Sequence, residues 1–88
     1  RSPGFCVGQY RLAKVYVERG EAELAMEHVD AVLANKACPI QEAFLLGGLV
    51  AQRLKRADRA SELFDRCAAM APRSCIAAEC RRYTEMIH

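Results

Sequence analysis

The sequence predicts an all-α chain of five helices joined by short turns. Three observations support this fold class. Apolar residues recur at steps of three and four, as they do along one face of a helix. Residues that favour helix starts and helix ends separate the apolar segments. The usual signs of strands, Asn-Gly or Asp-Gly turns and runs of β-branched residues, do not occur in the sequence.

The first helix is expected to begin at Ser2-Pro3, a capping residue followed by proline at the first helical position. Gly20 ends it, because glycine readily adopts the left-handed backbone that follows many helices. The second helix begins near Glu21, whose negative charge suits a helix N-terminus. It ends before Pro39, because proline disfavours helix in the residue before it.

Pro39 can itself serve as the first position of the third helix. Gly47-Gly48 lies in the middle of this helix, although each glycine there costs about 1 kcal/mol of helix propensity. Two glycines at this place predict a close approach by a neighbouring helix. The fourth helix is expected to start near Ala57 and to stop at Ala71-Pro72, and Ser74 is expected to cap the fifth.

Length and composition predict one small domain, residues 1–88, with ordinary globular composition. The net charge of +2 is too small to indicate nucleic-acid binding. No apolar run approaches the roughly 18 residues of a membrane span, so no membrane association is expected. Because the sequence has no initiator methionine and no secretory signal, we expect a piece of a longer chain in the cytoplasm.

The five cysteines are interpreted as small buried apolar residues in a reducing compartment. No Cys-x-x-Cys occurs, and neither histidine lies near a cysteine pair with metal-ligand spacing. No metal site is therefore expected, and a structural disulfide is the weaker alternative.

The sequence matches itself at a spacing of thirty-five residues. Small residues recur at this spacing, with Ala13 on Gly48 and Ala25 on Ala60. Such residues are needed where antiparallel helices press together, because larger side chains would force the axes apart. Other matched pairs are Tyr16 with Ala51, Gly20 with Lys55, Val29 with Phe64 and Val32 with Cys67.

These matched residues resemble the tetratricopeptide repeat, with a first copy at about 6–39 and a second at about 40–72. Residues 74–88 resemble the capping helix of that family. The resemblance implies antiparallel helix pairs arranged in a right-handed superhelix. Two positions depart from the family pattern, because Lys55 replaces a turn glycine and Pro39 comes two residues late.

The sequence contains no constellation typical of catalysis, so no enzyme activity and no cofactor are expected. The resemblance instead implies a concave groove lined by the first helix of each pair. Its implied groove residues are Val7, Tyr10, Lys14, Val17, Glu18, Glu42, Leu45, Leu49, Gln52 and Arg53. Such a mixed surface suits an extended peptide or a partner helix with apolar anchors and a few acids. For Leu45 and Leu49 the alternative is ordinary core packing.

The predicted function is a protein–protein interaction or scaffold module whose partner is another protein. One alternative is a structural segment of a larger protein or complex, which could also form a homo-oligomer. A weaker alternative is a pentatricopeptide-like binder of single-stranded RNA. That family reads bases with small polar residues, whereas the corresponding positions here hold Gln9-Tyr10 and Phe44-Leu45.

Overall fold

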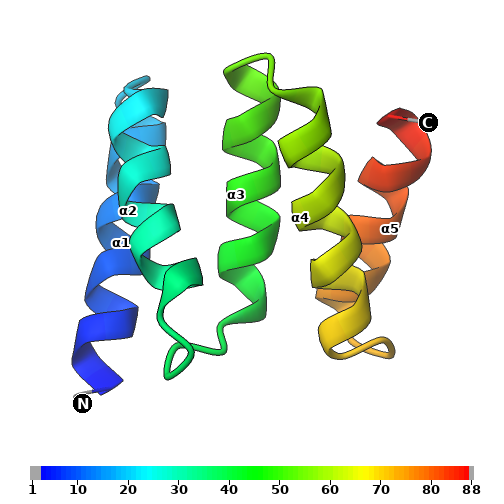
Figure 1. Cartoon of the computed structure of the whole chain (residues 1–88), viewed down its shortest axis with the longest axis horizontal. Helices are drawn as coiled ribbons and strands as arrows, with labels where there is room; N and C mark the ends of the chain where they lie inside the picture. The colour runs from blue at the N-terminus through cyan, green and yellow to red at the C-terminus, as the bar shows by residue number, and fades with distance from the viewer. Residues whose placement is uncertain (1–2, 88) are drawn as a thin grey trace.

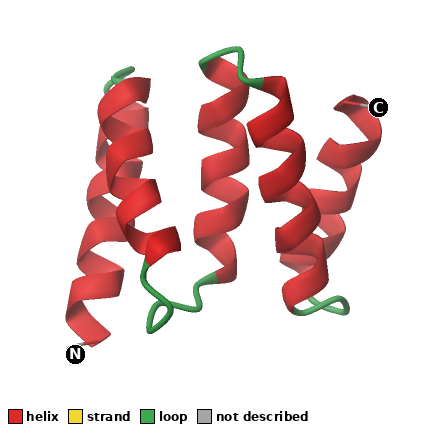
Figure 2. Ribbon diagram, viewed as in Figure 1, coloured by secondary structure: helices red, strands yellow, loops and turns green. Residues whose placement is uncertain are grey.

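The computed structural model describes residues 3–87 of the chain, and the side chains of residues 5–86. It contains five helices, and each runs antiparallel to its neighbour along the chain (Figure 1). They are α1 (Pro3–Glu18), α2 (Ala22–Ala34), α3 (Gln41–Arg53), α4 (Ala57–Met70) and α5 (Cys75–Ile87). Every regular element of the described chain is a helix (Figure 2), which confirms the predicted all-α fold. Within the same residues, no helix has the length and apolar character needed to cross a membrane.

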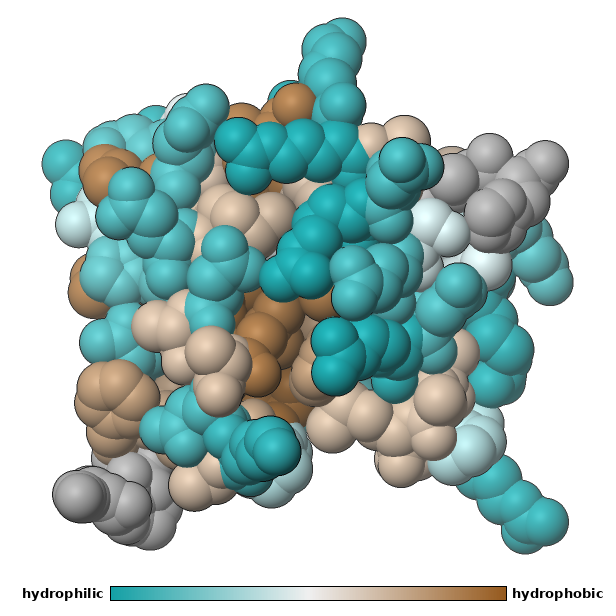
Figure 3. Space-filling view, in the orientation of Figure 1, coloured by the Kyte–Doolittle hydropathy of each residue, from teal (hydrophilic) through white to brown (hydrophobic). Residues whose placement is uncertain are grey.

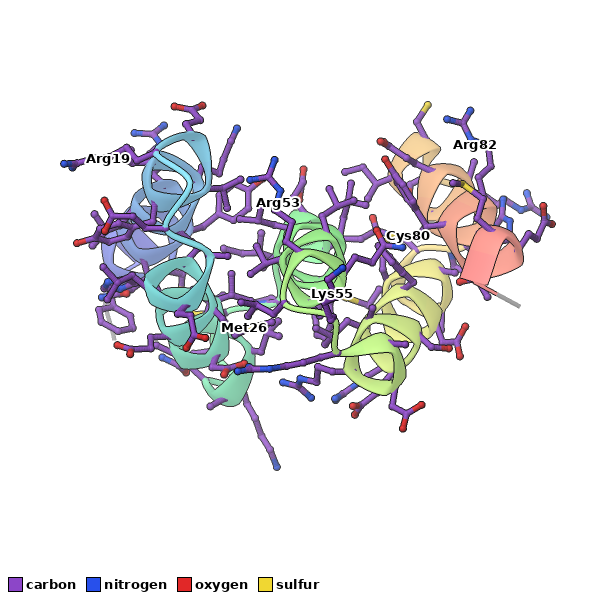
Figure 4. The ribbon with its side chains drawn as sticks, turned by 90° about the horizontal axis from the view of Figure 1, so that it is seen from above. Arg19, Met26, Arg53, Lys55, Cys80 and Arg82 are labelled. Atoms are coloured by element: carbon purple, nitrogen blue, oxygen red, sulfur yellow. A yellow bond between two sulfur atoms is a disulfide. The ribbon has the colours of Figure 1, made fainter. Side chains whose placement is uncertain are left out.

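The helices form two layers (Figure 4). Seen along the helix axes, α1, α3 and α5 lie along a concave arc, and α2 and α4 lie on its convex side. Consecutive helices pack directly on one another, and α3 also contacts α1 and α5 within its own layer. The third helix is therefore the centre of the molecule.

The turns that close the first two helix pairs are built alike, thirty-five residues apart. Gly20 lies in the left-handed region at φ 78°, and Lys55 adopts the same region at φ 61°. Equivalent backbone hydrogen bonds close the two turns, from the amide of Glu21 to the carbonyl of Tyr16 (2.8 Å) and from Arg56 to Ala51 (2.9 Å). Lys55 thus takes the same left-handed backbone conformation as Gly20 in the equivalent turn.

Ser74 caps α5 as expected, because its Oγ accepts a hydrogen bond from the amide of Ala77 at 2.9 Å. The predicted cap at Ser2 lies outside the described residues. The expected start of the third helix at Pro39 is wrong, since α3 begins at Gln41. The amide of Ile40 donates to the carbonyl of Cys38 at 2.9 Å, and this tight turn around Pro39 keeps the proline outside the helix.

The paired glycines of α3 lie between two neighbouring helices, as the sequence predicts. A Cβ atom at Gly48 would overlap the ring of Phe64 on α4 and come within 2.6 Å of its Cζ. A Cβ at Gly47 would lie 3.0 Å from Cγ1 of Val29 on α2. Phe64 is fully buried and stacks on Tyr83 of α5, with ring centroids 5.0 Å apart. The core therefore depends on helix axes that approach closely at the centre of α3.

Four of the five cysteines form disulfides, so their interpretation as reduced core residues is wrong. Cys6 pairs with Cys38 and Cys67 with Cys80, at Cα–Cα distances of 5.4 and 6.1 Å that are normal for disulfides. Cys75 is free and exposed. The paired residues are 32 and 13 positions apart in sequence, on different elements, so their pairing depends on the fold and not on local spacing.

Candidate functional site

The ten groove residues implied by the sequence lie on α1 and α3, the first two helices of the concave layer. Within each helix they follow steps of three and four, so they share one face. Arg53 points from α3 into the concave side of the molecule (Figure 4). The two helices contact each other directly.

A pocket of about 340 Å³ lies between the C-terminal halves of α1 and α3. Its lining residues are Val17, Leu46, Leu49, Val50, Gln52 and Arg53. The structure therefore brings four of the ten groove residues together around one hollow. Nη1 of Arg53 donates a long hydrogen bond of 3.4 Å to the carbonyl of Val17, which links the two helices at the mouth of the pocket.

Three further groove residues interact nearer the start of α1. The Nζ atom of Lys14 lies 5.6 Å from the ring centroid of Tyr10, within the range of a cation–π contact. Burial raises the pKa of the Tyr10 hydroxyl above its ordinary value, and the negative charge of Glu42 raises that pKa further. Tyr10 is thus a neutral hydrogen-bonding group at neutral pH, with a cation and an anion beside it.

The remaining groove residues are less closely joined. Val7 and Glu18 are exposed at either end of the α1 face. Leu45 is half-buried and packs against the main core, so its alternative interpretation as a packing residue holds. Leu49 packs against the same core but also lines the pocket, so it serves both roles.

Two pocket residues, Leu46 and Val50, were not among the groove residues implied by the sequence. Leu46 precedes Leu49 by three positions, so helical spacing alone could have added it to the face. Val50 is almost fully buried, and only its position at the base of the pocket connects it to the site.

A second pocket, of about 440 Å³, opens between α2 and α4 and was not foreseen from the sequence. Figure 3 shows it as an apolar hollow bordered by hydrophilic side chains. The guanidinium carbon of Arg66 lies 5.5 Å from the ring centroid of Phe44 at this pocket. Its lining residues are Leu33, Asn35, Lys36, Cys38, Pro39, Phe44, Arg66, Ala69 and Met70.

The side chains that the structure describes contain no group of three or more His, Cys, Asp or Glu residues able to hold a metal ion. Nδ1 of His28 lies 2.8 Å from Oε1 of Gln9, and its ring stacks on Tyr16 with centroids 5.3 Å apart. His28 therefore joins α1 to α2 and has a structural role.

A comparison of the chain with protein-family models, curated proteins and solved structures finds no match. The resemblance to the tetratricopeptide repeat therefore stays a prediction that rests on the residues quoted for it.

Proposed function

We propose that the chain binds an extended peptide or a helix of another protein on its concave face, without chemical turnover. The observation that carries the proposal is the pocket between α1 and α3, where Val17, Leu49, Gln52 and Arg53 meet. A preformed hollow between two helices lowers the cost of binding, because the protein's own side chains need little reordering. Such binding would also give the chain a scaffold role, because a chain that holds one partner on its concave face can hold a second molecule elsewhere on its surface.

The composition of this pocket indicates the chemistry of its ligand. Val17 and Leu49 supply apolar walls, which favour an aliphatic or aromatic side chain as an anchor. Arg53 is exposed and carries a permanent positive charge beside them. Towards the start of α1, Lys14 adds a second cation and Tyr10 a neutral hydroxyl. The best ligand is therefore an apolar residue followed or preceded by an acidic one.

The compartment is part of the same proposal. The expected cytoplasmic location relied on reduced cysteines and on the lack of a secretory signal, and the Cys6–Cys38 and Cys67–Cys80 disulfides remove the first of these two grounds. Disulfides persist in oxidising compartments and are rare in the reducing cytosol. We place the binding event in an oxidising compartment, where both disulfides remain closed.

The proposal can be tested by selecting peptides from a random 12-residue display library on the whole immobilised chain. We expect enriched peptides to share an aliphatic or aromatic residue next to Asp or Glu. Their affinity is then measured by fluorescence anisotropy against Arg53→Glu, an exposed substitution that leaves the core intact. Binding should weaken at least tenfold, because a close charge contact is replaced by repulsion.

The matched control is Arg66→Glu, which reverses one of the two exposed cations, Lys36 and Arg66, that line the second pocket. This variant should bind the selected peptides as the unchanged protein does. Leu49→Ala should also weaken binding, and circular dichroism checks the fold of this variant, because Leu49 packs against the core as well as lining the pocket. If Arg66→Glu loses binding and Arg53→Glu keeps it, the peptide binds between α2 and α4 and the concave-face proposal is wrong.

A further inference from the structure

Large apolar side chains are exposed along the edge formed by α1 and α2. Phe5, Leu12 and Val15 on α1 are 47%, 38% and 43% exposed, and Leu24 on α2 is 38% exposed. Together with Gly8, the three α1 residues follow steps of three, four and three, so they form one stripe on the helix. We call Phe5, Gly8, Leu12 and Val15 the outer face of α1. Apolar atoms are also visible along this edge of the molecule in Figure 3.

The thirty-five-residue spacing shows what covers the corresponding face of α3. The equivalent pairs are Gly8 with Ala43, Leu12 with Gly47, and Val15 with Val50. On α3 these positions are buried, with Ala43 at 0% and Val50 at 1% exposure. A Cβ at Gly47 would lie 3.0 Å from Cγ1 of Val29 on α2 and equally 3.0 Å from Cδ1 of Leu63 on α4, so helices of both the preceding and the same pair reach this position. The outer face of α1 therefore repeats a face that, one helix pair later, is covered by a helix.

Leu24 fits the same pattern on the second helix of the pair. Its equivalent on α4 is Arg59, which reaches back to α2 and forms an ion pair with Asp30 at 3.1 Å. Position 59 thus faces the preceding helix pair. Leu24 occupies that position on α2, where it is apolar and exposed. A helix covering the outer face of α1 would lie on the side that Leu24 also faces.

We propose that the outer face of α1 docks an amphipathic helix of a partner protein, packed antiparallel to α1 as α2 packs on α3. The partner helix presents aliphatic residues at the spacing of Val29, Val32 and Leu33 of α2. Arg11 and Arg19 border the stripe, where the next helix pair has Leu46 and Leu54 at the equivalent positions. Arg19 also forms an exposed ion pair with Glu21 at 3.6 Å. Acidic residues beside the aliphatic ones would therefore complement this border.

A second copy of the chain fits this face less well than a partner helix. In a second copy, the apolar face of α2 is not available to cover the outer face of α1, because Val29 and Val32 are already buried against α3 of the same copy. At the opposite end of the molecule, α5 exposes one large apolar residue, Met86 (75%), beside the charged residues Arg81, Arg82 and Glu85. One methionine among three charged side chains is a poor match for an apolar stripe, so head-to-tail stacking of copies is disfavoured.

A synthetic peptide with the sequence of residues 21–37 tests the proposal, because α2 is the helix that covers the equivalent face of α3. A lactam joining Glu23 to a lysine placed at position 27 holds the peptide helical, since short helices are marginal alone. Both positions are exposed in α2. Titrated into the whole ¹⁵N-labelled chain, the peptide should shift the amide signals of the outer face with sub-millimolar affinity.

Variants locate the binding. Leu12→Glu, a substitution at an exposed position, should weaken the binding of the peptide at least tenfold. Val7→Glu is the matched control, because Val7 is similarly exposed on α1 (42%) but is not part of the outer face and belongs to the groove residues implied by the sequence. A peptide with Val29 and Val32 changed to serine should not bind. Circular dichroism of both protein variants checks that the helices are intact.

Three results would overturn the proposal. One is a titration that does not saturate at about 1 mM peptide, because the dissociation constant would then exceed 1 mM, which corresponds to a binding free energy weaker than ~4 kcal/mol. Another is binding that Leu12→Glu leaves unchanged. The third comes from sedimentation of the chain without peptide: a dimer that Leu12→Glu dissociates and Val7→Glu does not would assign this face to a second copy.

Discussion

Replacing Gly48 by alanine should destabilise the protein, although alanine is the better helix former. Gly48 lies in the middle of α3, where the change would gain about 1 kcal/mol of helix propensity. The added methyl group, however, would overlap the ring of Phe64 and come within 2.6–2.7 Å of its Cζ and Cδ1 atoms. The ring cannot move away from the added methyl group, because Phe64 is fully buried and stacked on Tyr83.

The magnitude follows from these opposing effects. Overpacking a core costs about 1–3 kcal/mol, and overlap with several atoms of a confined ring belongs at the upper end. After the propensity gain, we expect the free energy of unfolding to fall by about 2 kcal/mol. A domain of this size has only about 4–13 kcal/mol in total, so the change is easy to measure.

Two other glycines supply matched controls in the same urea-unfolding assay, with both disulfides closed. A Cβ at Gly8 has no atom within 4 Å, so Gly8→Ala should raise the free energy of unfolding by about 0.5–1 kcal/mol. At Gly47 the nearest atoms are methyl groups at 3.0 Å on Leu63 and Val29, which can shift slightly. Gly47→Ala should therefore be close to neutral. If Gly48→Ala were as stable as the unchanged protein, the close packing of α3 against Phe64 would be refuted.

Further predictions concern the disulfides and Tyr10. Mass spectrometry of the denatured, unreduced chain after iodoacetamide treatment should show one adduct, on Cys75, and two or more adducts would contradict the pairing. Cys6→Ser/Cys38→Ser and Cys67→Ser/Cys80→Ser should lower the free energy of unfolding by ~3.7 and ~2.9 kcal/mol, because their loops differ in length. Since burial and Glu42 raise the pKa of Tyr10, the folded state favours its protonated form, and this stability should be lost as the pH rises above about 10. In absorbance titrations at 295 nm, with Tyr10→Phe as reference, Glu42→Gln should lower the Tyr10 midpoint, and an unchanged midpoint would contradict the proximity of Glu42.

The sequence is informative wherever a local rule acts without tertiary competition. Gly20 ends α1 and Ser74 caps α5, because both effects depend on only a few neighbouring residues. The glycines of α3 were informative for a different reason. Their cost in a helix interior implies a compensating contact, and Phe64 supplies it at Gly48. The predicted start of the third helix at Pro39 was wrong because proline is common both at helix starts and in tight turns, and the neighbouring residues do not distinguish the two.

The cysteines and the groove needed the three-dimensional structure. Disulfide pairing depends on which cysteines the fold brings within reach, and Cys6 meets Cys38 only after α1 and α2 have packed together. The face of α1 and α3 follows from helical spacing, but the depth of the pocket beside Leu49 depends on how far apart the helices lie. The pocket between α2 and α4 joins residues from four segments, so no local pattern in the sequence indicates it.

The placement of the two disulfides also determines how far the chain can be extended by force. Each forms a closed loop, of 32 and 13 residue steps, within a chain of 88 residues. When the two ends are pulled apart, the force passes through the disulfides and not through the loops that they close. Only about half of the chain's residues can therefore be straightened, each adding roughly 3.5 Å of length. The segment between the loops, which includes all of α3, is the longest stretch that can be straightened. If the chain were pulled through a narrow pore that admits only one extended strand, it would stop at each loop until the disulfide closing that loop is reduced.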